Sequence, residues 1–114
     1  VLKQTPYTFV SRFENGAGTN PEELMAAAHA GCFTMKLSAD LTTAGHHPEE
    51  LTTTSTITLE NGVITRSDLV LIAKIDGISE QEFQKFAKDA EQNCPVSNAY
   101  KLEITLQATL LQTI

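Results

Sequence analysis

Two cysteines, an arginine and a glutamate are the residues of this chain whose types could combine into redox chemistry. The cysteines are Cys32 and Cys94. A cysteine reacts as its thiolate, and an apolar environment raises the thiol pKa and keeps it inert. A nearby arginine reverses this effect, and Arg12 is the only arginine in the first half of the chain. A buried arginine in turn needs a carboxylate, which Glu22 or Glu23 can supply.

Cys32 lies in the middle of a long segment with the pattern of a helix. Asn20 is a suitable N-cap, Pro21 suits the first helical position, and Gly45 is a stop signal, which predicts about 24 helical residues. From residue 24 to residue 35 there is no Asp, Glu, Lys or Arg. We therefore expect this helix to be buried on most of its sides.

Strand patterns lie on both sides of this helix. Residues 1–14 look extended and place Arg12 on a strand face, where a solvated charge is the simpler interpretation. Residues 52–59 and 63–76 read as two strands, and Asn61-Gly62 between them is a strong hairpin turn.

A second helix and a last strand complete the chain. Ser79 and Glu82 form a capping box, and the helix is expected to end near Asn93 because Pro95 blocks its continuation. Its apolar spacing extends to Cys94, and residues 102–110 then alternate as a strand. The order predicts a single domain over residues 1–114, of the α+β class, with an antiparallel sheet.

The long helix is apolar nearly all round, whereas the predicted strands cover only one side of it. A second copy of the chain is the simplest cover, which predicts a two-fold homodimer with the long helices near its centre. Glu22 and Cys32 are ten residues apart, or about 15 Å along one helix. Antiparallel helices in the dimer would bring them together, so we expect a composite site at the interface.

Composition narrows the choice of partner and compartment. The net charge is −6 and the basic residues are scattered, which argues against binding to nucleic acid or to an anionic membrane. The sequence has neither an apolar run long enough to span a membrane nor a visible signal peptide. Two cysteines are too few for a secreted disulfide scaffold, so a cytoplasmic protein is expected.

The residues alone leave two other interpretations open. Cys32 and Cys94 could be structural, as buried thiols or as a permanent disulfide in a dimeric binding module. His29 and Cys32, three apart on the helix, could instead bind a metal together with His46 and His47. Against this, Cys94 is the only obvious further soft ligand, and no Cys-x-x-Cys pair is present.

Four sequence blocks resemble a known family. They are Ser11-Arg-Phe-Glu, Gly18-Thr-Asn-Pro-Glu-Glu-Leu, Ala28-His-Ala-Gly-Cys-Phe-Thr-Met and Asn93-Cys-Pro-Val-Ser-Asn. In this order and spacing they resemble the OsmC (osmotically inducible protein C) family, which is related to the organic hydroperoxide resistance (Ohr) proteins. The Ala-His-Ala-Gly-Cys form favours the OsmC branch. Family members carry further strands before the position of Val1, and we expect this sequence to lack them.

The resemblance implies a thiol-dependent peroxidase that works as an intertwined homodimer without a cofactor or a metal. Cys32 would be the peroxidatic cysteine and Cys94 the resolving one. Arg12 would stabilise the thiolate and polarise the peroxide, and Glu22 would orient Arg12. The substrate would be a small hydroperoxide, and an external dithiol would reduce the oxidised pair.

An apolar lining around Cys32 bears on the substrate. We expect Met25, Phe33, Met35 and Phe83 to contribute to it, and such a lining suits organic hydroperoxides better than hydrogen peroxide.

Overall fold

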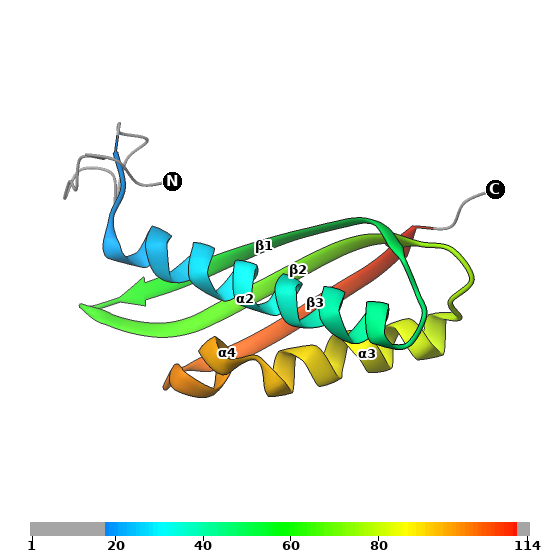
Figure 1. Cartoon of the computed structure of the whole chain (residues 1–114). Coiled ribbons are helices and arrows are strands. Elements are labelled where there is room, and N and C mark those ends of the chain that lie inside the picture. Colours follow the sequence, from blue (N-terminus) through cyan, green and yellow to red (C-terminus); the bar gives the residue numbers. More distant parts are fainter. Residues whose placement is uncertain (1–17, 112–114) are drawn as a thin grey trace.

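The computed structural model describes residues 18–111 as a three-stranded sheet with helices packed on one face (Figure 1). The elements in chain order are α2 (Pro21–Thr43), β1 (Pro48–Glu60), β2 (Val63–Ile75), α3 (Glu80–Asn93), α4 (Pro95–Ala99) and β3 (Glu103–Leu111). Helix α2 packs mainly on β1, whereas α3 packs on α2 and β3. The predicted α+β class is confirmed. The strand predicted for residues 1–14 lies outside the described residues.

Helix α2 begins and ends where the sequence predicts. The Asn20 side chain accepts a hydrogen bond from the Glu23 backbone N–H at 2.8 Å, and Pro21 occupies the first turn. The helix runs for 23 residues and stops before Gly45, whose φ of +90° favours glycine.

Burial of α2 is one-sided, so the expectation of burial on most sides is wrong for the single chain. His29, Phe33, Leu37 and Leu41 recur at helical spacing on the buried face. Met35, on the opposite face, is 75% exposed. The reason is the layer arrangement, because the described part of the chain places the sheet and α3 against one face of α2 and nothing against the other.

The β1–β2 hairpin forms as predicted, with β1 starting earlier, at Pro48. Asn61 and Gly62 have φ values of 52° and 78°, as a tight two-residue hairpin turn requires. The strands pair antiparallel, with Thr54 opposite Val70.

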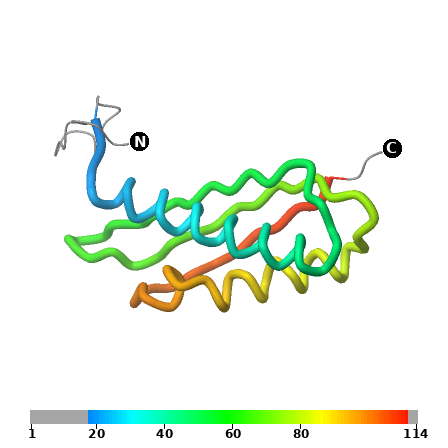
Figure 2. The backbone as a smooth tube through the Cα atoms, in the orientation of Figure 1, coloured from blue at the N-terminus to red at the C-terminus, as the bar shows by residue number. Residues whose placement is uncertain are grey.

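Strand β3 runs parallel to β2, with Leu69 opposite Leu106, so the prediction of an antiparallel sheet is wrong for this strand. The physical reason is the connection: α3 crosses the length of the sheet and returns the chain to the end where β2 began (Figure 2). A strand that follows such a crossover has the direction of the strand before it. The sheet, of order β1-β2-β3, is therefore mixed.

Helix α3 carries the predicted cap and reaches the predicted end. The Ser79 hydroxyl accepts from the Glu82 backbone N–H at 3.1 Å, and the helix stops at Asn93. Pro95 does more than stop it, because Pro95 is the first residue of the short helix α4. Cys94 is thus both the C-cap residue of α3 and the N-cap residue of α4.

The core lies between the sheet and the two long helices. Strand β2 contributes every second residue, as its alternation predicts. The buried apolar residues are Phe33, Leu37, Leu41, Leu69, Leu71, Ala73, Ile75, Phe83, Ala87, Ala90 and Cys94.

Candidate active site

The structure brings the two cysteines together. Cys32 is on α2, partly exposed, and Cys94 is fully buried at the junction of α3 and α4. Both are free thiols, and their side chains hydrogen-bond to each other.

Burial and the neighbouring thiol raise the pKa of Cys32. Desolvation is the largest cause, followed by the hydrogen bond to Cys94. Charge repulsion from Cys94, when that thiol is ionised, raises the pKa of Cys32 further. A hydrogen bond from the Val96 backbone N–H to the Cys32 sulfur acts in the opposite direction and lowers the pKa. Burial prevails among the described residues, so an additional cation is needed to make Cys32 a thiolate at neutral pH.

His29 lies one turn before Cys32 and is fully buried. Its Nδ1 is 2.6 Å from the Ser67 Oγ on β2, and its Nε2 is 2.7 Å from the Ser97 Oγ on α4. Ser67 Oγ is in turn 2.8 Å from Ser55 Oγ on β1. Burial lowers the pKa of His29, so the ring is held neutral, with one nitrogen donating and the other accepting.

Tyr100 packs beside His29 and the two thiols. Its ring meets the imidazole edge-on at 5.4 Å, and its hydroxyl donates to the Met25 carbonyl at 2.9 Å. Burial raises the pKa of Tyr100, and the charges that Cys94 and Cys32 carry when ionised raise it further.

An open hollow of about 570 Å³ lies on the surface beside Cys32. Its lining residues are Ala27, Ala28, Gly31, Cys32, Met35, Lys36 and Pro95. Met35 lines this hollow as expected, whereas Met25 is not among its lining residues. Phe33 and Phe83 are fully buried in the core instead, so their expected place in the lining is wrong. The Lys36 ammonium, 3.0 Å from the Asp40 carboxylate, is already paired.

Of the other two candidate residues, the structure describes Glu22, which does not lie at the thiols. Glu22 is in the first turn of α2, ten residues before Cys32, and about 15 Å separates those positions along the helix. Arg12 lies outside the described residues.

The metal interpretation gains nothing from the described part of the chain. His29 points into the core with both nitrogens hydrogen-bonded, while His46 stacks edge-on against Phe86 and faces Glu82 at 3.9 Å. Residues 18–111 contain no cluster of three or more potential metal ligands.

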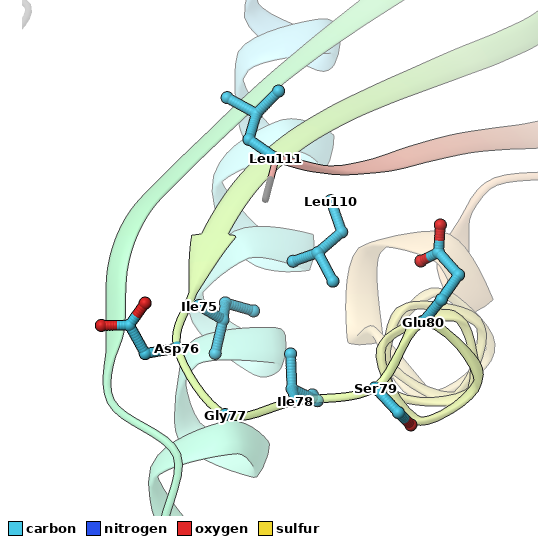
Figure 3. A pocket seen from close by; sticks show the side chains of 8 residues that line it. All are labelled: Ile75, Asp76, Gly77, Ile78, Ser79, Glu80, Leu110 and Leu111. Atoms are coloured by element: carbon cyan, nitrogen blue, oxygen red, sulfur yellow. The ribbon is translucent and has the colours of Figure 1, made fainter. Parts of the chain in front are cut away.

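A second hollow, of about 280 Å³, lies at the other end of α3 from Cys94 (Figure 3). Ile75, Ile78 and Leu110 point toward one another there, whereas Asp76 points away. Its lining has no thiol, histidine or cation, so the chemistry-bearing side chains gather at the cysteine end.

Sequence reasoning missed three participants near the thiols: Val96, Ser97 and Ser67. One signal was available for Ser67, which is in phase with the inward-facing Leu69 and Leu71 of β2. A serine in such a register predicts a buried hydroxyl that needs a polar partner. His29 lies in the core, and both of its ring nitrogens bond to serine side chains.

The fold and the adjacent thiols define an α+β protein with a two-cysteine site. The chain belongs to the OsmC-like protein family, whose model matches residues 14–109. It is 43% identical over 114 aligned residues to peroxiredoxin OsmC of Escherichia coli (strain K12), covering 96% of this chain and 80% of that protein. It is 31% identical over 99 residues to organic hydroperoxide resistance protein-like 2 of Staphylococcus epidermidis, covering 82% of this chain and 68% of that protein.

The fold has close structural matches as well. An OsmC-like protein from Mycoplasma pneumoniae superposes with a TM-score of 0.77 at 17% identity, covering 86% of this chain and 76% of that one. This match concerns the fold alone. Within residues 18–111, no helix has the length and apolar character needed to cross a membrane.

Proposed function

We propose that this chain, a peroxidase-type enzyme, reduces organic hydroperoxides with Cys32 as the peroxidatic and Cys94 as the resolving cysteine. The observation that carries the proposal is the hydrogen-bonded thiol pair, with the partly exposed member beside an open hollow and the other member buried behind it. The names of its relatives, a peroxiredoxin and an organic hydroperoxide resistance protein, agree with this activity.

The first step is attack of the Cys32 thiolate on one oxygen of the hydroperoxide. The O–O bond breaks, the sulfur is oxidised to a sulfenic acid, and the second oxygen leaves as an alcohol after taking up a proton. Cys94 then attacks the Cys32 sulfur, the S–S bond forms, and the hydroxyl leaves as water with the Cys94 proton. An external dithiol reduces this disulfide by thiol–disulfide exchange and is itself oxidised.

The raised pKa of Cys32 makes a cation part of the proposal. Arg12 is assigned this role: it stabilises the thiolate and donates hydrogen bonds to the charge that develops on the peroxide oxygens. Glu22 holds the guanidinium in place through charge-assisted hydrogen bonds.

A homodimer completes the site in this proposal. The exposed face of α2 is lined by small and apolar residues, including Ala27, Gly31 and Met35, and a second copy that packs there buries them. Antiparallel α2 helices bring the start of one helix, with Glu22, close to Cys32 of the other. The cytoplasmic location predicted from the composition stays a prediction.

Organic hydroperoxides are preferred over hydrogen peroxide because of the hollow. Alanine, methionine and proline side chains and the Gly31 backbone dominate its surface, and they can bury an alkyl group but offer little to a small polar peroxide.

Titration of free thiols tests the cysteine cycle. One equivalent of cumene hydroperoxide should remove two free thiols per chain from the reduced protein, and a dithiol should restore both. A structural pair would keep its thiol count through the same treatment, and that result would refute the redox role.

Mixed dimers test the composite site separately. Cys32→Ser and Glu22→Ala chains are each expected to be poorly active alone and to regain activity when mixed. In the mixed dimer, one of the two sites combines the native Glu22 of the Cys32→Ser chain with the native Cys32 of the Glu22→Ala chain. Mixtures of Cys32→Ser with wild-type chains provide the matched control. If the Cys32→Ser and Glu22→Ala mixture stays inactive while the control mixture is active, the cross-chain assignment is wrong.

A further inference from the structure

Three successive contacts join α2 to the segment around α4. The contacts run toward the start of α2 as they run toward the end of the α4 segment, so the two segments are antiparallel along this row. Cys32 contacts Cys94, His29 contacts Ser97, and the Met25 carbonyl accepts from Tyr100. The residues of each segment are three or four apart, which is one helical turn. The same helix that carries Cys32 therefore also holds the segment that carries Cys94.

The middle contact, His29 with Ser97, is the most buried of the three, and further hydrogen bonds on the strand side of His29 support it. Both residues are buried, and the second nitrogen of His29 is fixed by Ser67, which Ser55 contacts in turn. Helix α2 is thus tied to β2 and to α4 through one imidazole ring. Within residues 18–111 every buried side-chain nitrogen and oxygen has a hydrogen-bond partner, so removal of the Ser97 hydroxyl takes away the partner that the structure gives His29 Nε2.

The position of Ser97 links this contact to Cys94. Ser97 lies one turn after Cys94 in a helix of only five residues, and the Asn98 backbone N–H closes that turn on the Cys94 carbonyl at 3.1 Å. Such a short helix has little stability of its own, so its place depends on its packing contacts. Fixing the Ser97 hydroxyl on His29 therefore fixes the Cys94 thiol against Cys32.

We propose that His29 and Ser97 are positioning residues that set the rate at which Cys94 resolves the Cys32 sulfenic acid. The inference rests on the proposed function, in which these two cysteines form the disulfide. Neither residue touches the peroxide in this account. Their effect is to keep the Cys94 sulfur within reach of the Cys32 sulfur at the moment when the sulfenic acid forms.

A competing reaction makes this role measurable. The sulfenic acid can react with Cys94 to give the disulfide and water, or with a second hydroperoxide to give the sulfinic acid and an alcohol. The first reaction is intramolecular and depends on the position of Cys94, whereas the second depends on peroxide concentration. The ratio of the two products therefore reports resolution and does not depend on how fast Cys32 first reacts.

The experiment treats reduced full-length protein with a series of cumene hydroperoxide concentrations and counts disulfide and sulfinic acid by intact-mass spectrometry. Ser97→Ala removes the hydroxyl that His29 holds. Ser55→Ala is the matched control, since it removes a hydroxyl from the far end of the same network. Ser97→Thr keeps a hydroxyl at position 97 and tests rescue. Thermal unfolding of all four proteins identifies any that fail to fold.

For Ser97→Ala we expect the peroxide concentration that gives equal amounts of the two products to fall about tenfold, because a small misplacement of reacting groups has large kinetic effects. Ser55→Ala and Ser97→Thr should stay close to wild type. An unchanged ratio in Ser97→Ala, or an equal shift in Ser97→Ala and Ser55→Ala, would overturn the positioning role. Wild-type protein that forms neither product would instead refute the proposed function, and the inference with it.

Discussion

The two faces of α2 differ in burial and in the size of the side chains that they carry. One face carries Phe33, Leu37 and Leu41, all fully buried, together with His29, whose two nitrogens are both hydrogen-bonded. The other carries Ala27, Gly31 and Met35 in open hollows. Cys32 lies at the boundary, with its thiol against the buried Cys94 and its surface in a hollow. The difference teaches that one helix can be core on one side and present small and apolar residues in open hollows on the other.

The largest expected effect on stability comes from truncating a large side chain on the buried face. Phe33→Ala should lower the free energy of unfolding by about 3–5 kcal/mol, because it removes a fully buried ring and leaves a cavity between helix and sheet. Thr42→Ala, an exposed position on the same helix, is the control and should change it by no more than about 0.5 kcal/mol. Urea titration measures both values. Equal losses would mean that the two faces are not distinct.

The next effect concerns the exposed face and its predicted cover. If a second copy packs on Met35, Met35→Glu buries an unpaired charge there and should raise the dimer dissociation constant at least about 100-fold. Val63→Glu is the matched control, because Val63 is also exposed and apolar but lies at the hairpin. Sedimentation measures the association of each. A wild-type chain that is monomeric at micromolar concentration, or a Met35→Glu chain that dimerises normally, would contradict the predicted dimer.

A smaller effect comes from the histidine of the buried face. Because burial lowers the pKa of His29 in the folded chain, the unfolded chain takes up this proton first as the pH falls. His29 therefore costs nothing above its ordinary pKa of about 6.5, and stability is lost from there down to the lower folded pKa, by up to about 1.4 kcal/mol per pH unit.

The measurement for His29 is the free energy of unfolding between pH 7.5 and pH 5. His29→Gln lacks the titrating group, so its curve should fall less steeply than that of wild type over this range. Parallel curves would show that His29 titrates alike in the folded and unfolded states.

The predictable parts of this fold are those decided by neighbouring residues. The Asn20 cap, the Asn61-Gly62 turn, the Ser79 cap and the alternation of β2 each depend on a few adjacent positions, and all are present. The direction of β3 was predicted wrongly because it depends on where α3 returns the chain. Helix α4 was missed because Pro95 can both end one helix and begin the next.

The site shows the same division. Cys32 and Cys94 were identified as candidates from their types and from the family resemblance, and the structure places them together. The partners of His29 come from β2 and α4, which are far from it in sequence, and no local pattern pairs them. The roles of Arg12 and Glu22 stay predictions, as do the roles of the two cysteines in turnover.

The central claim is that Cys32 and Cys94 perform two different steps of one peroxidase cycle. Consumption of cumene hydroperoxide by wild type, Cys32→Ser and Cys94→Ser, with dithiothreitol as the dithiol, tests it most directly. Wild type should turn over, Cys32→Ser should lose activity by about 10³-fold or more, and Cys94→Ser should still be oxidised once at Cys32. Three chains equally inert toward the peroxide, or a Cys32→Ser chain as active as wild type, would contradict the account.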